Sequence, residues 1–193
     1  MSVRILGLSG STRTASLNKR LLRATLHHAE ARGASTTFLD LRDLEIPLYD
    51  GDLEASEGLP AGVRRLRKAL LESDGVLICS PEYNGSFSAT LKNAIDWASR
   101  PDPDDAEAPA AWQGRVAAIL SATPGGLGGI RGLIQLRTVL SGIGVHVIPR
   151  QLGVGSAHEV VTESGTIEHD GWRERVGGVV DDLMETAGRL RRD

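Results

Sequence analysis

The chain has 193 residues, 40% hydrophobic side chains and a formal net charge of −3. This length and composition fit a single globular domain over residues 1–193 with a sizeable core. The nearly balanced charge gives no basic footprint for nucleic acid and no strongly acidic tail. We therefore expect a protein that works on small molecules.

The only cysteine, Cys79, lies in the apolar run GVLICS, so the chain can form neither an internal disulfide nor a Cys-rich metal site. The start, MSVRILGLSG, lacks the apolar stretch and cleavage site of a signal peptide. The uncharged run between Arg115 and Arg131 contains Pro124 and four glycines and is too short to span a bilayer. These features predict a cytoplasmic protein with no membrane segment and no metal centre.

Mostly apolar runs without clean alternation predict strands that are buried on both faces. These runs begin at Val3, Ser35, Gly75, Arg115 and Gly144. Segments with helical period lie between and after them, at residues 16–32, 63–71, 91–98, 130–139 and 172–183. Gly33 is expected to end the first helix.

This alternation predicts an α/β fold: a flavodoxin-like, doubly wound, five-stranded parallel sheet in the order 2-1-3-4-5 with helices on both faces. One face of the second helix carries four cations and is interpreted as solvated: Arg64, Arg65, Arg67 and Lys68. The run PDPDDAEAP, residues 101–109, is predicted to be a loop near the sheet's edge or an active-site mouth. It is either a solvated acidic loop or a lid.

Polar or glycine-rich segments follow three of the predicted strands: SGSTRTASLN, SPEYNGS and SATPGGLGG. Ligands of an open α/β sheet bind at the carboxyl ends of its strands, near the switch in strand order. We therefore expect these three segments to meet at one crevice.

The first segment leads into a helix N-terminus, where main-chain N–H groups and the helix dipole favour an anion. Ser11, Arg13, Ser16 and Asn18 add side-chain donors of the kind that hold a phosphate. A simpler interpretation is a helix cap made by Thr14 or Ser16. A cap uses a single hydroxyl, so it leaves the other hydroxyls and the arginine unexplained.

Three common motifs are excluded by the residues present. No lysine follows a glycine, so the chain has no P-loop. Arg131 stands where a dinucleotide fingerprint starting at Gly126 needs its third glycine, and Ser11 stands where a hydrolase elbow around Ser9 needs a glycine.

The second segment has the composition of a tight turn, with Pro81 fixing φ and Asn84-Gly85 tolerating positive φ. Its main chain could read the edge of a flat heteroaromatic ring, or it could simply join a strand to a helix. The third segment, 123–129, has enough glycine to approach a ligand ring closely, or it could be a flexible loop.

With SGSTRTASLN, PEYNGSFSATLKNAIDW and SATPGGLGGIR in this order, the chain resembles the NADPH-dependent FMN reductase family of flavodoxin-like quinone, chromate and azo-dye reductases. The similarity runs over residues 5–149, and PEYN followed by LKNAIDW is its most specific part. One departure is that members commonly have Pro-Gly where this chain has Ser88-Ala89. We expect the helix to survive this change and the pocket wall to shift.

The resemblance implies FMN as cofactor and assigns residues to three parts of it. Those expected at the phosphate are Ser11, Arg13, Ser16, Leu17 and Asn18. Those expected at the isoalloxazine and ribityl chain are Pro81, Glu82, Tyr83, Asn84, Gly85 and Ser86. Those expected on the other side of the ring are Ser121, Gly125 and Gly126.

The expected activity is NADPH- or NADH-dependent reduction of a quinone or a similar electron-poor small molecule, in a ping-pong cycle. The chemistry is carried by FMN, so no catalytic side chain is assigned. The resemblance also implies a homodimer or homotetramer. A flavin reductase that supplies a monooxygenase and a non-catalytic flavodoxin-type electron carrier are the alternatives.

Overall fold

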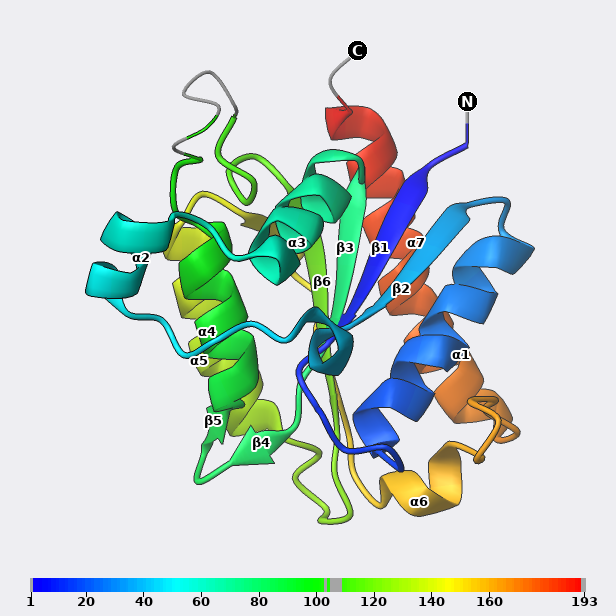
Figure 1. Ribbon diagram of the computed structural model, residues 1–193. Coiled ribbons are helices and arrows are strands. Elements are labelled where there is room, and N and C mark those ends of the chain that lie inside the picture. The colour runs from blue at the N-terminus through cyan, green and yellow to red at the C-terminus, as the bar shows by residue number, and fades with distance from the viewer. Residues whose placement is uncertain (1, 103, 105–108, 192–193) are drawn as a thin grey trace.

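The computed structural model describes residues 2–102, 104 and 109–191. Its centre is a parallel sheet in the order β2-β1-β3-β6-β7, with β8 also paired to β6 (Figure 1). The strands of this sheet are β1 (Arg4–Ser9), β2 (Ser35–Asp40), β3 (Gly75–Cys79), β6 (Val116–Ala122), β7 (His146–Val147) and β8 (Leu152–Val154). The predicted flavodoxin-like fold and strand order are confirmed.

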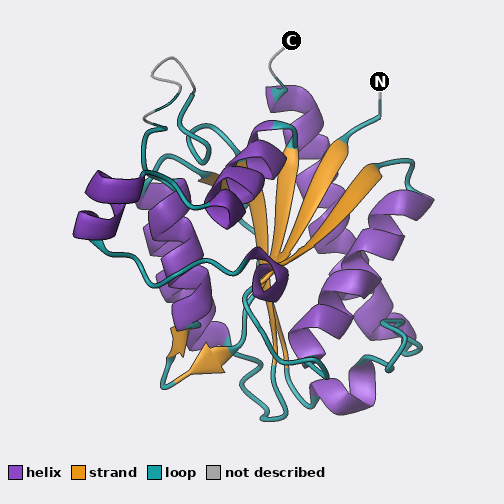
Figure 2. Ribbon diagram, viewed as in Figure 1, coloured by secondary structure: helices purple, strands orange, loops and turns teal. Residues whose placement is uncertain are grey.

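Helices cover both faces of this sheet (Figure 2). The long helices are α1 (Leu17–Ala31), α3 (Ala61–Leu71), α4 (Ala89–Ala98), α5 (Ile130–Gly142) and α7 (Asp170–Leu190). Successive residues of each central strand enter different cores, because side chains alternate across a strand. Ile5 and Leu77 pack with α1 and α7. Leu6 and Val76 pack on the other face, with α3, α4 and α5.

The expected fifth strand is the main correction to the predicted sheet, because it is divided into β7 and β8. β7 pairs with the start of β6 and β8 with its end. Pro149 between them has no N–H to give to a neighbouring strand. Arg137 of α5 donates to the carbonyl oxygens of Val147 at 3.2 Å and Ile148 at 2.9 Å. Its guanidinium therefore binds the main chain at the point where the strand is interrupted.

Several short elements were absent from the predicted set. These are a 3-10 helix η1 (Leu41–Leu44), the helices α2 (Gly51–Glu57) and α6 (Ala157–Val160), and the strands β4 (Glu82–Tyr83) and β5 (Ser86–Phe87). Each is too short to show a period in the sequence. β4 and β5 form an antiparallel hairpin of their own.

Two surface interpretations need correction. Arg67 is buried rather than solvated, and its guanidinium donates to the carbonyl oxygens of Ala98, the last residue of α4, and of Arg100 just after it. Of the acidic segment 101–109, residues 103 and 105–108 lie outside the described residues. Asp102 and Asp104 pair with Arg64 of α3. In Figure 1 the chain that follows α4 lies at the end of the molecule opposite the carboxyl ends of the strands. An active-site mouth is therefore wrong for these described positions.

The described helices include none with the length and apolar character needed to cross a membrane.

Candidate functional site

The three polar segments meet at the carboxyl end of the sheet, the lower end in Figure 1. The main-chain N–H of Gly10 donates to the carbonyl oxygen of Cys79 at 2.9 Å, which joins the first segment to the strand before the second. The Asn18 side chain donates to the carbonyl oxygen of Ala122 at 2.8 Å and accepts from its N–H at 2.9 Å. This pair of bonds joins the first segment to the third.

The loop between β1 and α1 presents a run of main-chain donors. From Thr12 to Asn18, the N–H groups have no acceptor within the described parts of the chain. Residues 12–15 are exposed. The run ends in the first turn of α1, where the positive end of the helix dipole adds to the same field. The loop is therefore built to receive an anion.

Some polar side chains of the loop between β1 and α1 bond within the protein, and others have no partner among the described residues. Ser16 caps α1 by accepting from the N–H of Lys19 at 3.4 Å, so the simpler interpretation holds for this hydroxyl. Thr14 accepts from Arg42 at 2.9 Å. Within the described residues, the hydroxyl of Ser11 and the guanidinium of Arg13 have no hydrogen-bond or ion-pair partner.

Asn18 and Leu17 differ from the expectation in how they can contribute. Both side-chain groups of Asn18 bond to the main chain of Ala122, which uses the amide oxygen and one of the two N–H donors of the amide. The main-chain N–H groups of both residues remain open. Asn18 therefore positions the loop through its side chain, and its backbone N–H remains open to an anion.

The second segment forms the β4–β5 hairpin. Asn84 and Gly85 have φ values of 52° and 79°, as a two-residue type I′ turn requires, so the predicted turn is confirmed. Gln135 of α5 donates to the carbonyl oxygen of Gly85 at 2.9 Å and accepts from the Ser86 hydroxyl at 2.7 Å. The turn is therefore fixed against α5, with Tyr83 half-exposed beside it.

The Glu82 side chain reaches the first turn of α5 and caps that helix. Its carboxylate accepts from the N–H of Gly132 at 3.0 Å and from the guanidinium of Arg131 at 2.8 Å. Burial opposes ionisation, but these hydrogen bonds outweigh it and hold the pKa of Glu82 below its ordinary value. Only the main chain of Glu82 is thus left for a ligand at the turn.

The glycine-rich loop after β6 has two kinds of glycine. A Cβ on Gly128 would lie 2.5 Å from the carbonyl carbon of Gly153, so this glycine permits close packing against β8. Gly125 and Gly126 are exposed, with open space where a Cβ would stand. Ser121 is buried, and its Oγ has no hydrogen-bond partner within the described residues.

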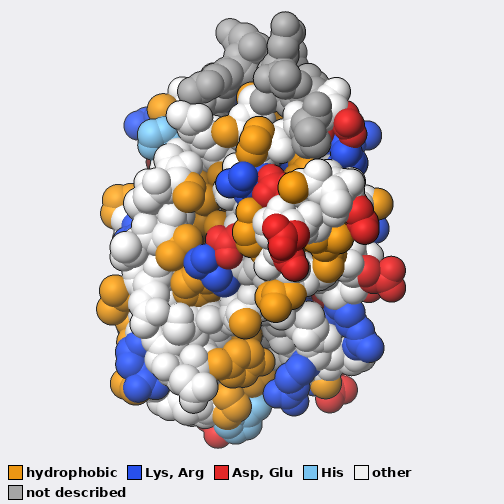
Figure 3. Space-filling view, turned by 60° about the vertical axis from the view of Figure 1, so that its left-hand side comes forward, with side chains coloured by type: hydrophobic (Ala, Val, Ile, Leu, Met, Phe, Trp, Pro, Cys, Tyr) orange, Lys and Arg blue, Asp and Glu red, His pale blue; other side chains and the backbone are white. Residues whose placement is uncertain are grey.

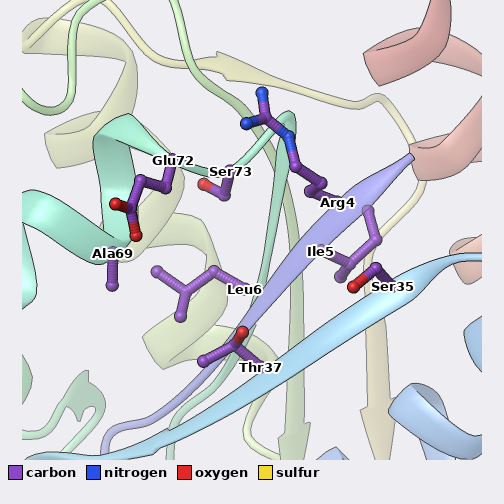
Figure 4. Close-up of a pocket in the computed structure, with 8 residues that line it drawn as sticks. All are labelled: Arg4, Ile5, Leu6, Ser35, Thr37, Ala69, Glu72 and Ser73. Atoms are coloured by element: carbon purple, nitrogen blue, oxygen red, sulfur yellow. The ribbon is translucent and has the colours of Figure 1, made fainter. Parts of the chain in front are cut away.

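The hollow drawn in Figure 4 lies away from this site. It has a volume of about 390 Å³ and is lined by the first half of β1, part of β2 and the end of α3. Its labelled side chains include Arg4, Thr37 and Glu72. Its lining includes Arg4 and Ser35, the first residues of β1 and β2, so the hollow lies at the amino ends of the strands and we do not assign it to the candidate site.

Comparison with known proteins identifies the family. The family model for NADPH-dependent FMN reductase matches residues 3–159. The chain belongs to this family. It is 36% identical over 191 residues to the NAD(P)H-dependent FMN reductase of Pseudomonas aeruginosa, covering 98% of this chain and 97% of that one. It is 41% identical over 148 residues to the NADPH:quinone oxidoreductase of Arabidopsis thaliana, covering 76% and 70%.

Solved structures agree with this FMN reductase assignment. The flavoenzyme NAD(P)H:(acceptor) oxidoreductase FerB from Paracoccus denitrificans superposes with a TM-score of 0.82 at 29% identity, over 97% of this chain and 98% of that one. A flavodoxin from the domain Archaea superposes with a TM-score of 0.60 at 12% identity, over 96% and 99%, which supports the fold alone. The expected family and enzyme class are confirmed: the FMN reductase described here is an NAD(P)H-dependent oxidoreductase with FMN as cofactor.

The local geometry fits this cofactor. Among the described residues, the N–H groups of residues 12–18 have no acceptor and Arg13 has no partner, and a rigid turn lies nearby. A phosphate monoester that carries a ring needs such a combination of donors and support. The sequence had not revealed the supporting residues Gln135, Asn93 and Trp97. Asn93 Nδ2 and Trp97 Nε1 of LKNAIDW both donate to the carbonyl oxygen of Pro47, at 2.8 and 2.9 Å, which fixes the loop before α2.

Proposed function

We propose that this FMN reductase uses NADPH or NADH to reduce quinones or similar electron-poor small molecules at an FMN site on the carboxyl end of its sheet. The observation that carries the proposal is the loop 12–18, whose main-chain donors lack acceptors in the described structure. Family membership supports FMN as the molecule that meets them. Relatives named as quinone reductases, such as that of Escherichia coli at 32% identity over 191 residues, support the acceptor class.

The phosphate of FMN is assigned to the loop and the first turn of α1. Ser11 and Arg13 contribute unengaged side chains, and Ser16 shapes the turn as its cap. Leu17 and Asn18 contribute main-chain N–H groups. A phosphate accepts several such bonds at once, and each is strengthened by the charge of the acceptor.

The isoalloxazine ring and ribityl chain are assigned to the hairpin and the glycine loop. The hairpin segment comprises Pro81, Glu82, Tyr83, Asn84, Gly85 and Ser86, and the glycine loop contributes Gly125 and Gly126. Ser121 lies directly beneath this loop, since a Cβ on Gly129 would fall 2.0 Å from its Oγ. We therefore propose that Ser121 supports the loop at the ring rather than forming an exposed wall.

When bound, FMN would accept a hydride from NADPH or NADH and pass electrons on to the acceptor. The chain's own residues bind, orient and stabilise. Main-chain N–H groups of Asn84 and Gly85 lack acceptors in the described structure and can stabilise negative charge on a reduced ring. The bonds of Gln135 and Glu82 keep these donors in place, so the site need not reorganise as charge develops.

NAD(P)H and the acceptor are proposed to use one open face in turn, since the sequence contains no second nucleotide-binding motif. The test is steady-state kinetics on FMN-loaded protein with a water-soluble quinone. Parallel double-reciprocal lines are expected, and intersecting lines would show a ternary complex instead. Protein that neither binds FMN nor oxidises NADPH or NADH in the presence of a quinone would contradict the proposed function itself.

We also propose a homodimer or homotetramer in the cytoplasm, with residues 1–193 folding as one domain. Large apolar side chains are exposed near the hairpin and α5: Tyr83 at 51%, Leu127 at 64% and Ile134 at 57%. Figure 3 shows hydrophobic side chains reaching the surface among charged ones on the side that carries α2 and α4. Sedimentation velocity tests the assembly, and a single species at 20.6 kDa would contradict it.

A further inference from the structure

Ser88 joins two parts of the proposed site. It is buried, with 3% of its surface exposed. Its hydroxyl donates to the carbonyl oxygen of Gly10 at 2.5 Å and accepts from the N–H of Leu91 at 3.2 Å. The same oxygen therefore caps α4 and holds the start of the phosphate loop.

The backbone of Ser88 adds another connection. Its N–H donates to the hydroxyl of Ser80 at 3.3 Å, at the end of β3. A proline at position 88 would have neither this N–H nor the hydroxyl. Gly10 fits closely against both serines, because a Cβ there would lie 3.0 Å from each Oγ. The contact between the loops is thus close, and its bonds use both the N–H and the hydroxyl of Ser88.

The bond to Gly10 acts on the donors of the loop through the peptide plane. The carbonyl of Gly10 and the N–H of Ser11 belong to one rigid peptide unit. Ser88 binds that unit on its carbonyl side, and the hydroxyl of Ser9 accepts from its N–H side at 3.3 Å. This unit immediately precedes the exposed run of unaccepted N–H groups, so its orientation sets the direction in which that run leaves the sheet.

We infer that Ser88 is a positioning residue that preorganises the phosphate loop for FMN through the carbonyl of Gly10. The inference rests on the proposed FMN site. An exposed loop loses less conformational freedom on binding when its ends are already fixed. Asn18 fixes the far end by its bonds to Ala122, and Ser88 fixes the near end. Ser88 contacts neither substrate nor cofactor in this assignment.

The test compares FMN with riboflavin, which has the same ring and ribityl chain but no phosphate. Dissociation constants are measured by flavin fluorescence for wild type, Ser88→Ala and Ser88→Gly. Glycine is a good N-cap, so Ser88→Gly keeps α4 while removing the bond to Gly10. The FMN dissociation constant is expected to rise about tenfold in both variants, and that of riboflavin less than twofold. Ser88→Thr, which keeps a hydroxyl, is expected to restore most of the FMN affinity.

Ser99→Ala is the matched control. It removes a hydroxyl from the other end of α4, where Ser99 donates to the carbonyl oxygen of Asp96 at 2.7 Å. Equal losses of FMN and riboflavin affinity in the Ser88 variants would show a general structural role and overturn the inference, as would no loss at all. If Ser88→Ala does not fold, the FMN and riboflavin dissociation constants of Ser88→Gly alone test the inference. Wild-type protein that binds no FMN would instead refute the proposed function.

Discussion

Arg13 lies on the exposed part of the loop between β1 and α1, with no partner for its charge within the described residues. Arginines on this protein commonly meet carboxylates, as Arg4 meets Asp74 at 2.7 Å and Arg32 meets Asp181 at 2.8 Å. An unpaired guanidinium beside unaccepted N–H groups leaves a site where a dianion gains several charge-assisted bonds. Arg13 therefore has its clearest use in binding the FMN phosphate.

Arg13→Ala is expected to raise the FMN dissociation constant about 10- to 100-fold, because one charge-assisted contact to the phosphate is lost. Riboflavin affinity and the midpoint of urea unfolding are expected to stay nearly unchanged. Fluorescence titration measures the first two quantities. Arg65→Ala, an exposed cation on α3, is the control. Unchanged FMN affinity in Arg13→Ala would refute the assignment of the phosphate to this loop.

Glu82 is the residue whose role changed most between sequence and structure. The PEYN motif suggested a ring neighbour, and the structure places its carboxylate on the N-terminus of α5. Its pKa is lowered in the folded protein, so its contribution to stability is present above the ordinary carboxyl pKa and is lost as pH falls through the lower folded value.

Glu82→Gln is therefore expected to unfold more easily than wild type near pH 7, by about 1 kcal/mol. This difference is expected to shrink as the pH falls below the ordinary carboxyl pKa and through the lower pKa of Glu82 in the folded protein, where the wild-type carboxylate becomes protonated. Urea unfolding between pH 3 and 7 measures it. Glu168→Gln, at an exposed carboxylate, is the control. A difference that stays constant over the whole range would contradict the role of ionised Glu82.

At the scale of elements, the divided strand β7–β8 depends on one side chain. Arg137 binds the carbonyl oxygens of Val147 and Ile148 and the side-chain oxygen of Gln151 at 2.9 Å. The surrounding burial lowers its pKa, since desolvation penalises the charged form. The guanidinium donates to main-chain carbonyl oxygens that the N–H groups of an adjacent strand would bind in a continuous sheet.

Arg137→Met keeps the apolar stem and removes these donors. It is expected to lower the free energy of unfolding by about 2–3 kcal/mol, because partly buried carbonyls lose their partners. Urea denaturation gives the difference. Arg189→Met breaks only an exposed pair with Glu185 and is expected to cost less than about 0.5 kcal/mol. Equal effects of the two substitutions would show that Arg137 does not support the interrupted strand.

For the molecule as a whole, the proposed cofactor site joins three separate strand ends. We therefore expect cofactor binding to raise the free energy of unfolding of the entire domain. A ligand present at 100 times its dissociation constant stabilises the folded state by about 2.7 kcal/mol if it does not bind the unfolded chain. For a protein of this size that corresponds to a rise of roughly 5–10 °C in the unfolding temperature.

Differential scanning calorimetry with and without FMN measures this shift. Wild type is expected to show it in full, and Arg13→Ala a much smaller one at the same FMN concentration. Stability that does not depend on FMN concentration would contradict a site shared by these loops. Riboflavin at the same concentration provides the comparison without a phosphate.

The amino-acid sequence was enough to predict the family, the strand order and the three segments that meet at one end of the sheet. The family came from the resemblance carried by PEYN and LKNAIDW. The strand order and the shared end came from the alternation of apolar runs and helical periods, which record which faces are buried. The type I′ turn was also predictable, since Asn84-Gly85 tolerates the required positive φ.

The bonds made by the polar side chains in and beside those segments became known from the folded structure. Asn18 bonds to Ala122, Glu82 caps α5 and Ser88 binds Gly10, and each partner is distant in the sequence. Arg137 at the divided strand and buried Arg67 likewise bind carbonyl oxygens of other segments. A side-chain hydrogen bond between remote segments leaves no period or spacing in the chain, because it depends on where the fold brings the two groups.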